Sequence, residues 1–156
     1  MGFGDPNRNP RRQRRLEPTV GAPRFASWLL AATAALLITS CGGPSGDPQR
    51  GEELYRQQKL GGGAAPGCVS CHSLDPGVVK VGPSHANVGS RAQGVIQEPG
   101  YQGEATTAAE YLRESILDPN AHVAEGFDPG VMYQDYAEVL TEQQIEDLVA
   151  FLLTQR

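Results

Sequence analysis

The sequence has few of the residues that mark several large classes of protein. Its 156 residues include two lysines, three cysteines and one tryptophan, and 18 acidic side chains outnumber 13 basic ones. The acidic balance excludes a typical nucleic-acid-binding domain, which is strongly basic. No apolar run reaches the length of about 20 residues that a spanning helix needs, which excludes a multi-span membrane protein. At this length we expect one domain.

Charge divides the chain into two unequal parts. Residues 1–40 contain six arginines and two acids, whereas residues 41–156 contain seven bases and 16 acids, a net charge of −9. The arginine-rich start is followed by residues 25–39, which carry no charge. A basic segment before a short apolar run is typical of a signal peptide. We therefore expect residues 1–40 to be a signal peptide and the protein to be exported.

The end of this segment predicts a lipid anchor. Residues 38–41 read Ile-Thr-Ser-Cys, with small residues before a cysteine, and so resemble the lipobox of bacterial lipoproteins. We expect cleavage before Cys41 and acylation of its thiol, so that acyl chains hold the mature chain on a membrane. An uncleaved signal anchor is the alternative. Arg14 and Arg15 suggest a twin-arginine signal, but the residues after them match it poorly.

The small residues after the predicted anchor favour a flexible tether over residues 41–47. Asp47 and Pro48 have the order of an N-cap followed by proline at the first helical position, which predicts a helix from Pro48 to about Lys59. The glycine-rich residues 61–67 are expected to contain no regular element.

The two remaining cysteines belong to the most specific motif of the chain. Residues 68–72 read Cys-Val-Ser-Cys-His, the C-x-x-C-H pattern of covalent c-type haem attachment. Residues three and four apart lie on one face of a helical turn, so the thiols of Cys68 and Cys71 can bond to the porphyrin while His72 reaches the iron. A thioredoxin-like disulfide expects a βαβ context that the flanking loops lack. A zinc site would need further ligands at short spacing, and the other histidines are too distant along the chain.

The sixth iron ligand decides between electron transfer and the binding of small ligands. Met132 is the one methionine of residues 41–156, and it follows Asp-Pro-Gly-Val in a turn-rich segment. Methionine ligation closes the iron and raises its reduction potential, and we expect Met132 to be this ligand. His122 and His85 are the alternative ligands, and a gap-filling role in the core is the ordinary one for methionine.

Two further helices are marked by their N-terminal residues. Thr107 and Glu110 have the spacing of a capping box, as do Thr141 and Gln144. Apolar residues follow each box at helical spacing, and residues 118–120 end the first of these helices. These patterns predict an all-α chain with long loops.

Residues 48–156 closely resemble a class I, monohaem cytochrome c. The resemblance implies that the N- and C-terminal helices cross and that long loops wrap around one covalently bound haem c. In that family a glycine and an aromatic residue of the first helix meet an aliphatic and an aromatic residue of the last one. Gly51, Tyr55, Leu148 and Phe151 match these positions.

The resemblance also implies two residues that support the haem. The carbonyl of Pro83, in the pair Gly82-Pro83, is expected to orient His72. Arg91 stands where the family places a basic residue near a haem propionate. A solvated surface arginine is the equally weighted alternative for Arg91.

Several positions depart from the family pattern. Tyr133 follows Met132 where proline is common, and Asn87 replaces a common glycine. His85 stands where a leucine usually packs on the proximal side of the haem, and we expect it at the rim, facing solvent. Residues 41–156 lack tryptophan, so Tyr101 is the candidate replacement for a tryptophan that contacts a propionate.

These observations predict a membrane-tethered electron carrier rather than an enzyme. Residues 111–132 are similar to cytochrome domains of bacterial respiratory complexes, including the lipid-anchored monohaem subunit of alternative complex III and the haem domains of oxidase subunit II. We therefore expect a role in a respiratory or photosynthetic chain, in the periplasm or on the outer face of the cytoplasmic membrane. Expected partners are redox proteins or a membrane respiratory complex, with no nucleic acid and no small-molecule substrate.

Two other functions remain open at this stage. A labile bond from Met132 to iron would permit a haem-based sensor or a peroxidase-like enzyme. A structural haem subunit of a larger complex is the second alternative. With two lysines and a net charge of −9 over residues 41–156, we expect docking to rely on the exposed haem edge rather than on a basic patch.

Overall fold

The structure, a computed structural model, describes residues 45–156. The predicted signal peptide and Cys41 lie outside the described residues. Within residues 45–156, no helix is both long and apolar enough to span a bilayer. The elements, in chain order, are α1 (Pro48–Tyr55), β1 (Lys59–Leu60), η1 (Gly61–Gly63), β2 (Ala65–Pro66), α2 (Cys68–Cys71), α3 (Val88–Val95), α4 (Ala108–Leu117), α5 (Tyr136–Val139) and α6 (Glu142–Thr154).

Helix α1 begins as the sequence predicts and ends earlier. The Asp47 side chain accepts hydrogen bonds from the backbone N–H groups of residues 49 and 50, and Pro48 occupies the first turn. The helix ends at Tyr55 rather than near Lys59, because Lys59 and Leu60 pair in antiparallel register with residues 65–66. The chain reverses through three glycines with positive φ, residues 61–63. The expectation that residues 61–67 contain no regular element was therefore wrong.

The last residues of the predicted tether pack against α6. The Gln143 side chain donates to the Ser45 carbonyl at 3.1 Å, and the Asp47 N–H donates to the Asp147 carboxylate at 2.7 Å. A Cβ atom on Gly46 would lie 2.0 Å from the carbonyl oxygen of Glu146. Residues 45–47 are thus held in place, unlike the flexible tether predicted over residues 41–47.

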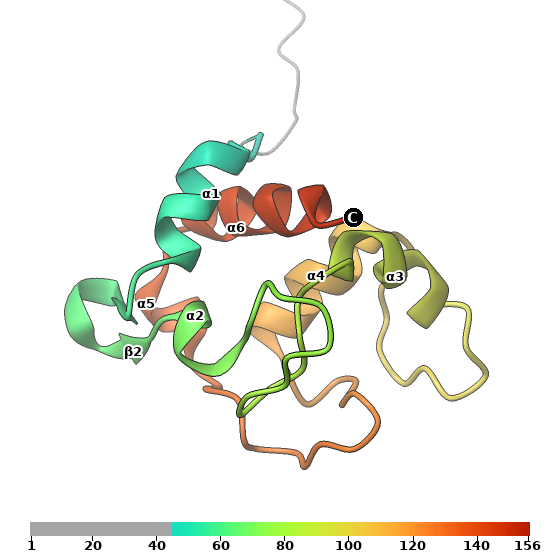
Figure 1. Cartoon of the computed structure of the whole chain (residues 1–156). Helices are drawn as coiled ribbons and strands as arrows, with labels where there is room; N and C mark the ends of the chain where they lie inside the picture. Colours follow the sequence, from blue (N-terminus) through green and yellow to red (C-terminus); the bar gives the residue numbers. More distant parts are fainter. Residues whose placement is uncertain (1–44) are drawn as a thin grey trace, which may run out of the picture. The chain divides into compact units, whose positions relative to one another are not determined.

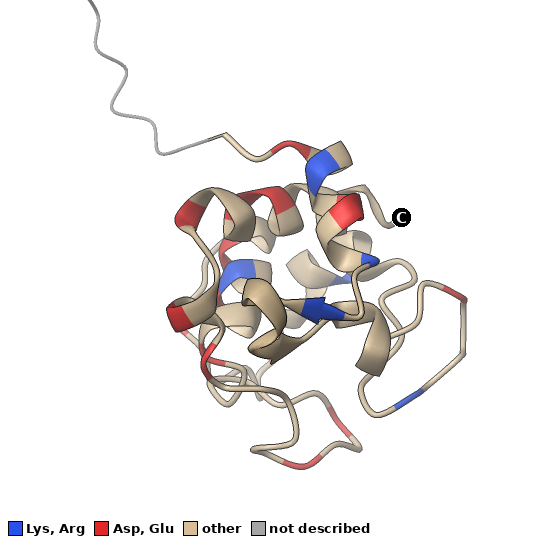
Figure 2. Cartoon of the chain, turned by 90° about the vertical axis from the view of Figure 1, so that its left-hand side faces the viewer, with Lys and Arg blue, Asp and Glu red and all other residues tan. Residues whose placement is uncertain are grey.

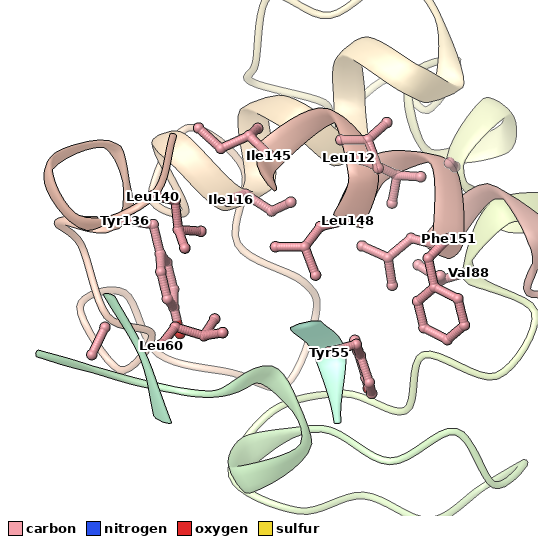
Figure 3. Packing of buried hydrophobic residues seen from close by; sticks show 14 residues of the cluster. Tyr55, Leu60, Val88, Leu112, Ile116, Tyr136, Leu140, Ile145, Leu148 and Phe151 are labelled. Atoms are coloured by element: carbon pink, nitrogen blue, oxygen red, sulfur yellow. The ribbon is translucent and has the colours of Figure 1, made fainter. Parts of the chain in front are cut away.

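The N- and C-terminal helices cross in close contact, as the family resemblance implies (Figure 1). A Cβ atom on Gly51 would lie 1.9 Å from the Asp147 carbonyl oxygen, so the two backbones touch at this point. One turn later, the rings of Tyr55 and Phe151 pack with centroids 5.3 Å apart. Leu148 fills the space beside them and is almost fully buried (Figure 3). The predicted crossing residues are confirmed.

Both predicted capping boxes are present. Thr107 and Glu110 exchange side-chain and backbone hydrogen bonds at the start of α4, and Thr141 and Gln144 do the same at the start of α6. Helix α4 packs on α6 and buries two apolar side chains one turn apart. The mostly helical fold is confirmed, with a two-stranded sheet as its one extended part among residues 45–156. The buried core that supports the site includes Tyr55, Leu60, Val88, Leu112, Ile116, Tyr136, Leu140, Ile145, Leu148 and Phe151 (Figure 3).

Candidate cofactor site

A cavity of about 630 Å³ lies beside α2 and under the loop between α4 and α5. A volume of this size suits an organic cofactor. The cavity wall includes the two thiols of the C-x-x-C-H motif, His72 and Met132. The motif and Met132, which the sequence singled out independently and which lies 60 residues beyond His72, are therefore brought to one place. The remaining wall is mainly apolar and includes Val88, Val95, Leu112, Ile116, Leu148 and Leu152.

The C-x-x-C-H motif forms a single helical turn. Helix α2 runs from Cys68 to Cys71, and the N–H of His72 closes the turn on the Cys68 carbonyl at 2.9 Å. The two thiols are not joined by a disulfide. Burial raises the pKa of the Cys68 thiol to about 12, whereas redox-active Cys-x-x-Cys motifs have lowered thiol pKa values. At Cys68 this shift is opposite to the one that a dithiol oxidoreductase uses.

His72 is buried, and its ring is held in place by two neighbours, Pro83 and Gly82. Its Nδ1 atom lies 2.9 Å from the Pro83 carbonyl oxygen, which can only accept, so Nδ1 carries the proton and Nε2 is left with a lone pair for a metal. A Cβ atom on Gly82 would lie 2.4 Å from the His72 ring. Burial lowers the pKa of His72, against the effect of its bond to Pro83. The neutral ring is the form that binds iron.

Arg91 borders the cavity and also braces the segment before α3. Its guanidinium donates to the carbonyls of Ser84, at 2.9 Å, and Ala86. Arg91 is exposed. Arg91 is therefore not a free surface arginine. Part of its hydrogen-bonding capacity holds residues 84–86, and the rest is available at the cavity.

Met132 is half-buried in the loop between α4 and α5. Its carbonyl accepts from the Gln134 side chain at 2.5 Å, and Asn120 bonds both to Gln134 and to the N–H of Gly130. These bonds clamp the loop on both sides of the methionine. The ring of Tyr133, which stands in place of the usual proline, packs edge-on against Tyr136 with centroids 5.0 Å apart. The Asn120–Gln134 clamp could not be predicted from the sequence, because a polar pair 14 residues apart has no local signature.

The expectation that His85 faces solvent at the rim was wrong. Its ring stacks on the ring of His72, with centroids 3.8 Å apart and planes 16° from parallel. Its Nδ1 atom lies 3.2 Å from the Tyr55 hydroxyl. Burial lowers the pKa of His85 well below its usual value, and the nearby His72 and Arg91 act in the same direction. If His72 were to bind the iron of a haem, the second protein ligand would have to come from the other side of the cavity, so His85, in ring contact with His72, does not fit that role.

The expectation that Tyr101 contacts a propionate was also wrong. Its hydroxyl bonds to the Glu114 carboxylate and accepts from the N–H of Ala105, and Tyr101 is not among the residues that line the cavity. Tyr111 and His122 line the cavity instead. The His122 ring packs against Tyr101 and Tyr111, with centroids 5.1 and 6.3 Å apart. Tyr101, Tyr111 and His122 all lie near α4, so the sequence did not predict which of them would line the cavity.

The fold and the site define a protein that binds haem covalently, since a one-turn pair of thiols, a histidine and a methionine share one cavity. The family model described as Cytochrome c matches residues 48–156. The chain therefore belongs to the cytochrome c family, whose members carry covalent haem c and transfer electrons. No curated protein matches the chain.

The residues of the cavity fit haem c. Cys68 and Cys71 have the spacing that thioether bonds to a porphyrin require, and His72 and Met132 offer a nitrogen and a sulfur donor. The apolar wall suits the macrocycle. Arg91 and Tyr111 place polar groups at the border of the same cavity.

Proposed function

We propose that this chain is a class I, monohaem electron carrier whose haem is linked to Cys68 and Cys71 and whose iron is bound by His72 and Met132. The observation that carries the proposal is that His72, held by Pro83, and Met132, held by its clamped loop, line the same cavity as both thiols. The bound haem supplies one-electron Fe(II)/Fe(III) chemistry. The domain itself turns over no substrate.

The residues of the chain contribute orientation and exclusion of water. The Pro83 carbonyl keeps the proton on Nδ1 of His72, which leaves the other ring nitrogen available at all times. The bonds among Asn120, Gly130 and Gln134 hold the methionine loop in one conformation. A ligand set that is held rigidly in both oxidation states favours rapid electron exchange, because little rearrangement accompanies it.

Optical spectra of the purified protein test this assignment. The ferric protein is expected to show the weak band near the red end of the spectrum that sulfur–iron ligation gives, and Met132→Ala is expected to lose it. Val79→Ala is the control, since Val79 is 62% exposed and does not line the cavity. A Met132→Ala spectrum identical to that of the parent would refute the ligand and point to His122.

Addition of CO to the ferrous protein separates the carrier from the alternative functions. A carrier with a closed iron is expected to bind CO slowly or not at all. Rapid binding by the parent protein would favour a haem-based sensor or a peroxidase-like enzyme. The clamp around Met132 supports the closed form.

We further propose that Cys41 is acylated and that the carrier is exported and tethered to the outer face of a membrane. The support is the order of basic segment, short apolar run and small residues before Cys41. Expression of the full chain with Cys41→Ser is expected to move the haem protein from the membrane fraction to the soluble fraction, with its haem content unchanged. Retention of the variant in membranes would favour an uncleaved signal anchor.

The proposed partner is a redox protein or a quinol-oxidising complex of a respiratory or photosynthetic chain. Val81 and Val131 line the cavity and are 55% and 52% exposed, so two apolar side chains are exposed at its edge. Acidic residues greatly outnumber basic ones over the domain (Figure 2). Docking through the apolar rim is expected to give electron-transfer rates that depend weakly on ionic strength. A steep fall of the electron-transfer rate with added salt would refute docking through the apolar rim. Failure of the protein to accept electrons from any quinol-oxidising partner would favour a structural haem subunit.

A further inference from the structure

The ring of His85 occupies one face of the proximal histidine. The two rings are nearly parallel and in contact, with centroids 3.8 Å apart. His85 is not a member of the C-x-x-C-H motif, and no local pattern of the sequence links it to His72. The Pro83 carbonyl, by contrast, meets His72 at the edge of its ring.

His85 is itself held from several directions. Its Nδ1 atom bonds to the hydroxyl of Tyr55, which is fully buried and packs on Phe151 at the crossing of α1 and α6. The backbone N–H of His85 donates to the Ser73 carbonyl at 2.7 Å. Arg91 holds the carbonyls of the residues on either side of it. Tyr55 therefore links the ring to the buried crossing of α1 and α6.

A single hydrogen bond does not determine the orientation of an imidazole ring. The bond from Nδ1 to Pro83 fixes one edge, but the ring can still tilt about this bond and turn about the bond from Nε2 to a metal. A parallel ring stacked on one face removes these two freedoms, because either motion would push the rings together. The glycine at position 82 allows this arrangement by leaving no Cβ against the ring.

We propose that His85 is a positioning residue for the proximal ligand: the Tyr55 hydroxyl orients the His85 ring, and the stacked His85 ring sets the plane in which His72 binds the haem iron. The inference rests on the proposed role of His72 as an iron ligand. The plane of an axial imidazole determines its π overlap with the iron d orbitals. It therefore determines the direction of the magnetic axes of the ferric haem.

The cyanide complex of the ferric holoprotein gives a direct readout. Cyanide replaces the sixth ligand and is cylindrically symmetric, so the spread of the four haem methyl proton resonances reports the plane of His72 alone. A ring held in one plane gives a wide spread, and a ring that samples several planes averages it. His85→Ala, which removes the ring that covers His72, is expected to narrow the spread, and His85→Phe, which keeps an aromatic face, to retain most of it.

Tyr55→Phe tests the second half of the proposal and removes one oxygen atom. It is expected to narrow the spread to a value between those of the parent and His85→Ala. Tyr101→Phe is the matched control, because it removes a tyrosine hydroxyl bonded to Glu114 away from the cavity, and its spectrum should match that of the parent. Denaturant unfolding of each variant shows whether a changed spectrum reflects loss of the fold or rotation of the His72 ring.

The possible results separate the role of His85 from the proposed ligation of iron by His72. Parent-like spectra for His85→Ala and Tyr55→Phe together would overturn the role of His85. A narrowed spread in His85→Ala with an unchanged Tyr55→Phe would overturn the part assigned to Tyr55. If His85→Ala fails to accumulate as holoprotein, His85→Gln, which also lacks an aromatic ring, replaces it, and a parent-like spectrum of that variant would overturn the role of His85. A parent protein that gives no histidine–cyanide low-spin spectrum would refute the ligation by His72 itself.

Discussion

Gly51 of α1 lies so close to Asp147 of α6 that a methyl group at position 51 would be 1.9 Å from the Asp147 carbonyl oxygen. The obstacle is backbone, which cannot rotate away as a side chain can. The Asp147 carboxylate meanwhile accepts bonds from Arg50, Gln143 and the N–H of Asp47. The helix crossing therefore combines close backbone contact with a buried, fully bonded carboxylate, and the core beneath the cofactor cavity depends on both.

Gly51→Ala is expected to destabilise the holoprotein by about 3 kcal/mol or more, because the helices must separate to admit the methyl group. Gly94→Ala is the matched control, since Gly94 lies in α3 with open space around its Cα. Alanine favours a helix over glycine, so the control is expected to be neutral or to gain up to about 1 kcal/mol. Urea unfolding followed by far-UV circular dichroism measures both. Equal stabilities of the two variants would contradict the crossing.

Asp147 is expected to make the protein sensitive to acid. Hydrogen bonding to Arg50 and to its other donors lowers the pKa of the carboxyl from 3.8 to about 2. Because the folded pKa is depressed, the stabilisation is complete above about pH 4 and is lost as the pH falls towards 2. It amounts to at most about 2 kcal/mol, since the exposed Arg50 is screened by solvent.

Asp147→Asn is expected to remove this pH dependence. Unfolding free energies measured from pH 6 to pH 2 should fall less steeply in the variant than in the parent, and the two curves should converge at low pH. Glu52→Gln is the control, because the Glu52–Arg56 pair is exposed and within one helix, where such pairs contribute at most about 0.5 kcal/mol. Parallel curves for the parent and Asp147→Asn would contradict the assignment.

Gly82→Ala is expected to displace the proximal histidine. Its methyl group would lie 2.4 Å from the His72 ring, so either the ring or the segment that carries the Pro83 carbonyl must move. The ferric spectrum of the holoprotein should show a larger high-spin fraction, and stability should fall by roughly 1–3 kcal/mol. Gly100→Ala, with open space around it, should leave both quantities at parent values. A normal low-spin spectrum for Gly82→Ala would contradict the close contact between position 82 and the His72 ring.

Arg91→Gln is expected to loosen residues 84–86, because the guanidinium bonds two of their carbonyls at once. The loss should be about 1 kcal/mol, as Arg91 is exposed. Arg91→Lys should recover only part of it, since lysine lacks the planar fork that bridges two acceptors. Amide hydrogen exchange in residues 84–88 localises the effect. Full recovery by lysine would indicate that charge, rather than geometry, is what Arg91 contributes.

The local sequence was sufficient for the parts of this protein that depend on neighbouring residues. The C-x-x-C-H spacing, the N-cap at Asp47 and the capping boxes at Thr107 and Thr141 are each contained within five residues, and α1, α4 and α6 begin where these signals predict. The match to the family pattern located Gly51 and Pro83 in the same way. A short-range signal suffices because the hydrogen bonds that cap a helix close within one turn.

The tertiary structure alone decided which distant side chains meet. His85 stacks on His72, Tyr101 bonds to Glu114 instead of entering the cavity, and Asn120 clamps the loop of Met132. None of these contacts has a spacing rule, since loops of different lengths bring the partners together. A histidine 13 residues from another can face solvent or cover its ring with the same local sequence. The packing of α1 on α6, through Tyr55, selects between the two.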